Sequence, residues 1–416
     1  MKTWLTRVDH TLMWGSLLAL AISPTQYGFR LAGNMNVCLV DPLIWGLGGL
    51  LGLRLLVSRE WAVIKKPPVF AGLFFVFCAV SLVVSQSRMN GIKELIQYAE
   101  YFLVAPALFL HVLAMPRGRR WSLLVFAVAT SAVIGFGLTQ YLRLETVAAF
   151  AVGGSFGNAN VLGGFLSLVL PLALSFALSA DRPWWPRLWG AALFLAGLFS
   201  LLSGGALVAV LTASIALVCL WRTKTAWVAL AAVTALLMFI FPLLPRQNLW
   251  TAHDSIAVFT PDGEPAMRYP EWQAAAAMIA DRPLTGVGLG AYQSHVGQYA
   301  GVIPDENVKA EADSQNMYLV LASTIGIPGV LCFALLLAMG VARGVREFIE
   351  GGQLNHAAYK LGAAMALLAF AVNCVWSPLL VRGIGIPLAF ILALAYFLPV
   401  GGQKNVSPSC ESGKTQ

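Results

Sequence analysis

The sequence predicts an all-α fold: a polytopic transmembrane helix bundle of about 12 spans, with a helical loop over its outer face. Hydrophobic residues make up 58% of the 416 residues and charged residues only 11%, a balance that excludes an ordinary soluble enzyme. Apolar stretches of about 17 to 25 residues recur along nearly the whole chain, and each is long enough to cross the hydrocarbon core as a helix. Short polar breaks separate most of them.

The apolar stretches give one predicted span each. Two of them are separated only by the turn at 202–205, so this pair forms two spans, merges into one span, or re-enters the membrane. The predicted spans are 9–24, 37–57, 68–85, 94–114, 121–141, 159–180, 188–202, 205–221, 226–245, 316–342, 358–376 and 384–400.

The distribution of basic residues predicts the orientation. With the N-terminus inside, eighteen of the 27 lysine and arginine residues fall in inner breaks and nine in outer ones. Short cytoplasmic loops carry such an excess, so both termini are predicted to be cytoplasmic. The net charge of +8 therefore needs no nucleic-acid partner to explain it.

One long polar interruption divides the chain. The predicted organisation is transmembrane helices 1–9 at 1–245, an external loop with short helices at 246–315, helices 10–12 at 316–400, and a disordered cytoplasmic tail at 401–416. Within the loop, Pro270 and Glu271 suit the first turn of a helix. A second short helix is predicted from Ala291 to Tyr299. Aromatic side chains suit a cap at the membrane interface.

Some patterns are uninformative about chemistry. Five of the six cysteines lie in apolar stretches, and no metal-ligand spacing appears, so neither a metal nor a cofactor is predicted. The first apolar stretch lacks a small-residue cleavage site, and we expect residues 14–22 to form part of a retained helix.

Three motifs resemble the O-antigen ligase and O-antigen polymerase superfamily of lipid-linked glycan transferases. The first is GSFGNANVLGGFL at 154–166, the second is SLLSGGAL at 200–207, and the third runs from Arg268 through Gly290 to SQNMYL at 314–319 and GIPG at 326–329. Two positions depart from the family pattern. Gly204 stands where the family has arginine, and Gln315 stands where it has histidine.

The resemblance implies an inner-membrane, metal-independent glycosyltransferase. Such an enzyme transfers an undecaprenyl diphosphate-linked glycan at the periplasmic face, either to an acceptor glycan or to lipid A core. Gln315 in place of the ligase histidine favours polymerisation of a surface polysaccharide over ligation. A transporter or flippase of lipid-linked sugars is the alternative that the span count also fits, and a peptidoglycan polymerase that uses the same lipid carrier is a third.

A diphosphate needs cationic partners, and arginine pairs two phosphate oxygens with its planar fork. Arg268 is the first candidate because it matches the arginine that opens the family's loop motif. The other candidates at outer helix ends are Arg143, Arg88, Lys93 and Arg382. The alternative for each is an interfacial anchor.

An acceptor hydroxyl needs a base within hydrogen-bond reach. The catalytic candidates are Glu311 and Asp313, together with Gln315 at the motif position; His295 and His253 are weaker ones. Solvated loop charges are the alternative for these acids.

Asparagines at the starts of two predicted spans are candidates for sugar binding. Asn316, Asn158 and Asn160 each have a second interpretation as helix caps.

Carboxylates within spans are costly in lipid. Asp41 and Glu94 lie near predicted outer ends, whereas Glu100 is deeper and either faces a cavity or pairs with a buried cation.

Overall fold

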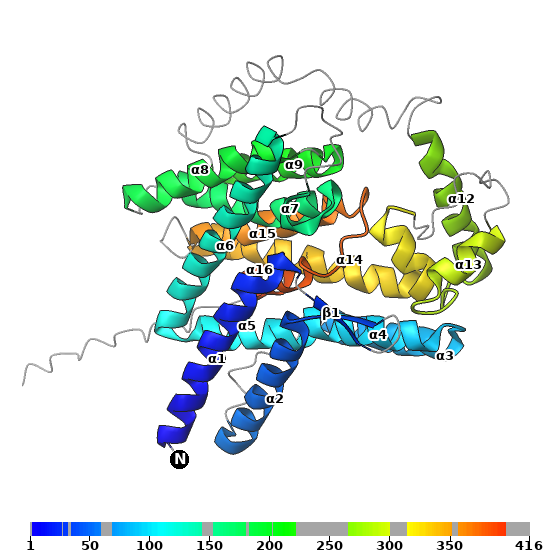
Figure 1. Cartoon of the computed structure of the whole chain (residues 1–416), viewed down its shortest axis with the longest axis horizontal. Coiled ribbons are helices and arrows are strands. Elements are labelled where there is room, and N and C mark those ends of the chain that lie inside the picture. Colours follow the sequence, from blue (N-terminus) through cyan, green and yellow to red (C-terminus); the bar gives the residue numbers. More distant parts are fainter. Residues whose placement is uncertain are drawn as a thin grey trace, which may run out of the picture.

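A computed structural model describes residues 2–26, 28–31, 35–59, 69–143, 153–179, 183–201, 203–221, 265–299, 314–351 and 357–396. The described part is built almost entirely of helices (Figure 1). The elements of the first half are α1 (Lys2–Ile22), η1 (Ser23–Thr25), β1 (Gly28–Leu31), β2 (Met35–Cys38), α2 (Val40–Ser58), α3 (Val69–Val84), α4 (Arg88–Ala99), η3 (Glu100–Val104), α5 (Ala105–Ala114), α6 (Pro116–Arg143), η5 (Gly154–Phe156) and α7 (Ala159–Leu178). The others are α8 (Trp184–Ser200), α9 (Gly204–Trp221), α12 (Pro265–Asp281), α13 (Tyr292–Tyr299), α14 (Met317–Gly351), α15 (Ala357–Asn373) and α16 (Gly385–Tyr396).

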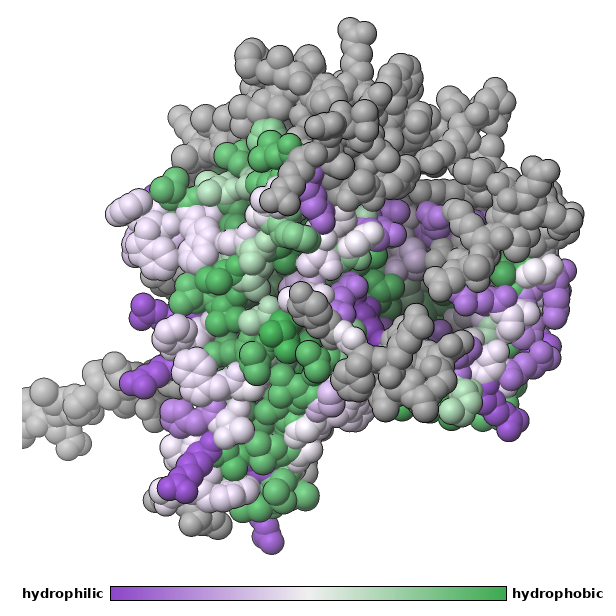
Figure 2. All heavy atoms as spheres, in the orientation of Figure 1, coloured by the Kyte–Doolittle hydropathy of each residue, from purple (hydrophilic) through white to green (hydrophobic). Residues whose placement is uncertain are grey.

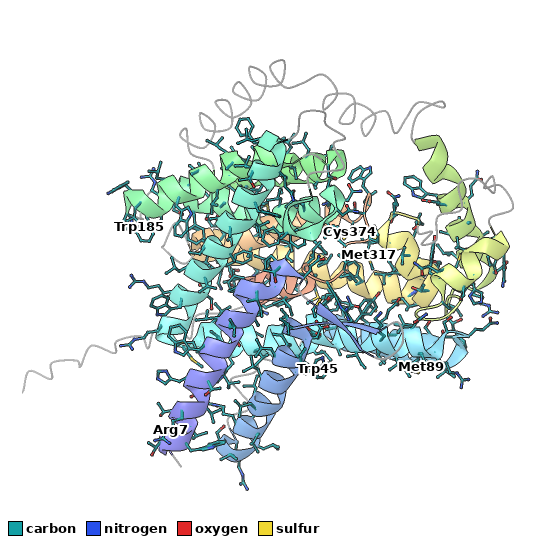
Figure 3. All side chains as sticks on the ribbon, in the orientation of Figure 1. Arg7, Trp45, Met89, Trp185, Met317 and Cys374 are labelled. Carbon is teal, nitrogen blue, oxygen red and sulfur yellow. The ribbon has the colours of Figure 1, made fainter. Side chains whose placement is uncertain are left out.

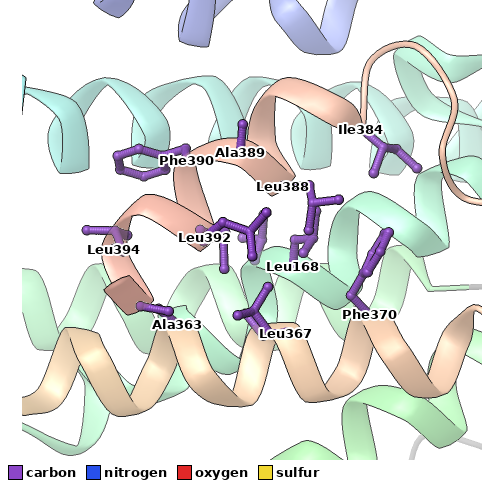
Figure 4. Packing of buried hydrophobic residues seen from close by; sticks show 14 of the residues in the cluster. Leu168, Ala363, Leu367, Phe370, Ile384, Leu388, Ala389, Phe390, Leu392 and Leu394 are labelled. Carbon is purple, nitrogen blue, oxygen red and sulfur yellow. The ribbon is translucent and has the colours of Figure 1, made fainter. Parts of the chain in front are cut away.

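The centre of the bundle consists of α7, α15 and α16. From Gly385 to Ala395 every residue of α16 is buried, as is nearly all of α7. Figure 4 shows Leu388 and Leu392 on the side of α16 toward Leu367 of α15. On another side, the Phe390 ring packs against α5 and α6, 5.4 Å from the ring of Phe109 and 5.1 Å from that of Phe126. Helix α16 is apolar on all sides, and other helices of the bundle therefore enclose it.

The outer surface of the bundle is apolar, as a lipid-facing surface must be. Figure 2 shows a broad hydrophobic surface over the bundle, and hydrophilic side chains over the part formed by α12 and α13. Among the described residues, six helical stretches are long and apolar enough to cross a membrane: 40–58, 88–114, 117–140, 159–178, 204–221 and 317–350. Three shorter apolar helices accompany them. The molecule is therefore a membrane protein of the all-helical class.

Most predicted spans fall on helices, but their count stays a prediction. The stretch 226–245 lies outside the described residues, and every other predicted span coincides with a helix. Helix α8 ends at Ser200 and α9 begins at Gly204, so this pair does not form one merged helix. The described part of α16 has 12 residues, which is about 18 Å and less than the roughly 30 Å of a hydrocarbon core.

A short β-hairpin corrects the all-α prediction locally. Strands β1 and β2 pair antiparallel between α1 and α2, with Gly28 opposite Cys38. The predicted span at 37–57 therefore starts three residues too early, because Val37 and Cys38 belong to β2 and α2 starts at Val40.

Helices α12 and α13 form a layer beside the bundle, packed on α14 (Figure 1). The first helix begins at Pro265, five residues before the predicted start at Pro270. Tyr292, His295 and Val296 are buried against this layer's own small apolar core. The Tyr299 hydroxyl donates to Asp281 at 2.8 Å and joins the two helices. The position of the α12–α13 layer as a cap over a periplasmic face stays a prediction.

A docking loop, residues 283–290, fastens this layer to the bundle. It enters a kink in α14, where Gly326 has a φ of 80° and leaves the helical conformation. The amide of Val287 donates to the carbonyl of Ser323 at 2.8 Å, and that of Ile327 to the carbonyl of Pro283 at 2.8 Å. A side-chain methylene at Gly326 would lie 2.2 Å from the Leu284 carbonyl oxygen, so only glycine permits this close approach.

The docking loop also contacts the turn between α3 and α4. The Ser85 hydroxyl donates to the Leu289 carbonyl at 2.9 Å, and the Gly290 amide donates to the Glu94 carboxylate. Glu94, which was predicted to lie near the outer end of a span, thus accepts a hydrogen bond from the docking loop. These bonds fix the α12–α13 layer to α4 and α14 at the same end of the bundle.

Candidate functional site

A bridging segment, residues 374–384, connects α15 to α16 and contacts several distant parts of the chain. At its beginning, the Cys374 carbonyl accepts the Met317 amide of α14 at 2.8 Å, and Figure 3 shows these two residues side by side. Further along, the Trp376 side chain lies against Gly205 at the start of α9, where an added methylene would be 2.7 Å from it. Leu379 packs in the same way on Gly164 of α7.

Arg382 lies near the end of the bridging segment in a polar cluster. Its Nη2 is 3.3 Å from Oδ2 of Asp41 at the start of α2. That same oxygen accepts the Cys38 amide at 3.0 Å, and the Gln26 amide group donates to the Arg382 carbonyl at 2.8 Å. With about a quarter of its side chain exposed (23%), Arg382 is held in place yet accessible.

The Cys38 thiol lies at the edge of this cluster. Burial raises its pKa above the ordinary value, and the Asp41 carboxylate raises it further. A raised pKa disfavours the thiolate, which is the nucleophilic form of cysteine.

Glu100 is a third charged residue of the same cluster. It begins η3, which is a π-helical turn between α4 and α5, and it interacts electrostatically with Asp41 and Arg382. The Trp45 side chain donates a hydrogen bond to it. Its Oε1 is buried and has no hydrogen-bond partner among the described residues. No ion pair of Glu100 with a cation lies within 4 Å in the part of the chain that the structure describes, so its two interpretations, a cavity-facing acid and a partner of a buried cation, both stay predictions. Single π turns occur frequently at functional sites.

The first motif forms a tight loop before α7. The Gln140 amide group makes two hydrogen bonds to Gly154, accepting from its amide at 2.9 Å and donating to its carbonyl at 3.2 Å. The Ser155 hydroxyl donates to the Pro24 carbonyl at 2.7 Å. Asn158 caps α7, since its Oδ1 accepts the amides of residues 160 and 161. The structure thus assigns Asn158 a capping role.

Asn160 joins the first motif to the second. Its Oδ1 accepts the Ser203 hydroxyl at 2.9 Å, and Ser203 lies in the turn before α9. The residue therefore connects two motifs that are far apart in the sequence, and its side chain is partly exposed.

Asn316 acts as the cap of α14. Its Oδ1 accepts the amides of Tyr318 at 3.0 Å and Leu319 at 3.1 Å, and the residue is 9% exposed. The preceding Gln315 has a φ of 46°, which is unusual for a residue other than glycine. The Trp272 indole donates to the Ser314 carbonyl at 2.8 Å, so α12 contacts the residues before this cap.

The remaining predicted residues are placed separately. Arg88 is exposed in the first turn of α4, as an interfacial anchor is, and Lys93 is partly buried one turn later, near Glu94. Arg143 ends α6 and Arg268 lies in α12, but only their backbone is described. The acids Glu311 and Asp313, and also His253, lie outside the described residues.

His295 contacts the backbone at the start of its own helix rather than the polar cluster. It is buried, and its Nδ1 lies 3.0 Å from the Ala291 carbonyl oxygen of the preceding turn. No group of three histidine, cysteine or acidic side chains suited to a metal occurs in the described ranges.

Sequence reasoning missed the convergence of Asp41, Glu100 and Arg382 on one cluster. Asp41 and Glu100 carried a recognisable signal, because an acid within an apolar stretch needs a partner. Gln26 and Gln140 carried no recognisable signal in the sequence, since polar amides at helix ends are common.

The fold and cluster define a class: a helical membrane protein with a polar cluster where the bridging segment meets α2 and η3, and a helical layer docked on α4 and α14. Residues 189–334, from α8 into α14, match the family model described as O-Antigen ligase. This match confirms the predicted resemblance to the O-antigen ligase superfamily, with the second motif and the whole of the third inside the matched range. The first motif precedes that range. No curated protein matches the chain.

Proposed function

We propose that this protein is a glycosyltransferase of the bacterial inner membrane that transfers an undecaprenyl diphosphate-linked glycan to an acceptor glycan at the periplasmic face. The observation that carries the proposal is the convergence on the bridging segment. The start of α14, both glycine-rich motifs and the Arg382–Asp41 pair all contact these eleven or so residues. Parts of the chain with family resemblance thus meet along the segment that carries Arg382.

Arg382 is suited to bind the diphosphate of the donor. Its guanidinium has five N–H donors, and one nitrogen, Nη2, faces Asp41. The donors that Asp41 and the Cys38 thiol do not use are available to phosphate oxygens in a bidentate geometry. The donor requires no metal in this scheme, because arginines neutralise the charge that develops on the departing diphosphate. Arg268 is proposed as a second arginine with the same role.

A carboxylate of the same cluster is suited to accept the proton of the acceptor hydroxyl. Asp41 is partly exposed and 3.3 Å from the guanidinium, so the base and the diphosphate-binding group are adjacent. The acceptor oxygen attacks the anomeric carbon, the bond from that carbon to the diphosphate breaks, and the proton passes to the carboxylate. Glu311, Asp313 and Gln315 remain proposed contributors from the segment before α14.

Chain polymerisation rather than ligation to lipid A core is the proposed activity, because Gln315 cannot act as the base that a histidine provides at this position. Deletion of the gene should then leave single repeat units on the outer leaflet. A ligase would instead leave uncapped core. A flippase, the alternative from another class, would leave lipid-linked units on the cytoplasmic leaflet.

The direct test is substitution of Arg382 by glutamine. In membranes supplied with lipid-linked repeat units, we expect Arg382→Gln to lower the transfer rate at least a hundredfold, about 2.7 kcal/mol in the barrier. The matched control is Arg346→Gln, since Arg346 is exposed near the far end of α14 and pairs with Glu350 at 2.7 Å. Wild-type glycan length in the Arg382 variant, with normal membrane levels, would refute the proposal.

A further inference from the structure

A cavity of about 590 Å³ lies between α6, α7, α8 and α15. It is lined mainly by apolar side chains, among them Phe126, Val169, Leu172, Phe176 and Leu193. Along α6 its wall extends from Arg119 to Thr130, which is about 16 Å at the rise of an α-helix. The cavity is thus long, apolar and bounded by helices of the bundle.

Two arginines stand at one end of this cavity. Arg119 and Arg120 lie in the first turns of α6, and the Arg119 guanidinium is 5.9 Å from the centre of the Tyr359 ring. Neither guanidinium lies within 4 Å of a carboxylate in the part of the chain that the structure describes. By contrast, Lys360 and Arg343, in the neighbouring helices, both contact Glu347. The two arginines therefore carry an excess of positive charge at the opening.

Tryptophans at the start of α8 also line this cavity. Trp185 is 49% exposed at the start of α8, and Figure 3 shows it at the outer end of that helix. Trp189 lines the cavity one turn further, and its indole donates to the Ser131 hydroxyl at 3.1 Å. Exposed tryptophan beside arginine is typical of the membrane interface. Basic pockets between transmembrane helices bind anionic lipid head groups.

We propose that this cavity binds an anionic glycerophospholipid, with its phosphate held by Arg119 and Arg120 and an acyl chain along the apolar wall. Charge selects the head group, because the guanidinium pair favours a net negative lipid over a zwitterionic one. The predicted orientation puts this end at the cytoplasmic leaflet. The site is separate from Arg382 and does not depend on the proposed glycan transfer.

The test measures lipid retained by the purified full-length protein. The protein in detergent is mixed with phosphatidylglycerol or with phosphatidylcholine of the same acyl chains, and native mass spectrometry counts the bound lipid. We expect phosphatidylglycerol to bind at least tenfold more tightly than phosphatidylcholine. The double variant Arg119→Gln/Arg120→Gln should remove this preference, whereas Arg346→Gln should keep it.

A second variant tests the cavity without changing charge. Ala127 lines the wall and is partly exposed, so Ala127→Phe fills the space at small cost to the fold and should reduce retention of both lipids. Equal binding of the two lipids to the wild type would overturn the proposal. Unchanged phosphatidylglycerol binding in either the double arginine variant or the Ala127 variant would do the same.

Discussion

Replacement of Gly290 by alanine should release the α12–α13 layer from the bundle. Gly290 has a φ of 72°, and an added methylene would lie 2.3 Å from the backbone nitrogen of Gly91 and 2.6 Å from the carbonyl carbon of Asn90. These atoms belong to one backbone peptide of α4, so no flexible side chain can move away to make room. The docking loop must therefore shift away from α4.

The cost has two parts. Alanine in the left-handed region costs about 1 to 2 kcal/mol. A shift of the loop also breaks the buried bond from Ser85 to the Leu289 carbonyl, and a buried polar group left without a partner costs about 1 to 3 kcal/mol. The docked state should thus lose about 2 to 5 kcal/mol, and since 1.4 kcal/mol is tenfold in an equilibrium, opening should increase about thirtyfold or more.

Hydrogen exchange of the α12 and α13 amides measures this opening directly. The matched control is Gly297→Ala, because Gly297 lies within α13 and a methylene there meets nothing within 4 Å. This control should slow exchange slightly, since alanine favours a helix over glycine by about 0.5 to 1 kcal/mol. Equal exchange in the two variants would show that the docking loop does not hold the layer, and would refute the reasoning.

Three further substitutions, together with two control substitutions, test other residues of the proposed site. Asn158→Ala removes the cap of α7 and should cost about 1 kcal/mol, seen as a lower midpoint of thermal unfolding in detergent. Ser203→Ala removes the hydrogen bond between the two glycine-rich motifs and should cost about 0.5 to 1.5 kcal/mol. Thr212→Ala should leave the midpoint unchanged, because that exposed hydroxyl bonds only within its own helix. Arg268→Ala should abolish glycan transfer and keep membrane insertion, whereas Lys404→Ala should change neither; glycan patterns and membrane fractionation measure both.

The helices were predictable because apolar periodicity and length are strong signals in a lipid-embedded chain. The two short helices of the external loop also followed from local chemistry, including the helix that ends near Tyr299. The β-hairpin was not predictable, since four-residue strands such as that from Gly28 to Leu31 leave little pattern. Burial in an apolar stretch marked Glu100 as unusual, but nothing local indicated that Arg382 would be its neighbour.

The candidate site shows why asparagine is hard to interpret from sequence. Asn158, Asn160 and Asn316 all precede or begin apolar helices, yet two of them cap and one joins two turns. A cap and a sugar ligand demand the same amide chemistry at the same helix position. Only the direction of the side chain separates them, and that direction depends on segments far away in the chain.

The π-helical turn at 100–104 sets the rotation of one half of a helix against the other. A π turn holds about one residue more than an α turn, and each residue of an α-helix adds about 100° of rotation. Loss of a single residue here would straighten the helix and swing α4 around its axis relative to α5. The side chains of α4 that contact the docking loop and those of α5 that contact α16 could then no longer face their partners at the same time. The number of residues in this turn is therefore constrained, even where the identity of their side chains is not.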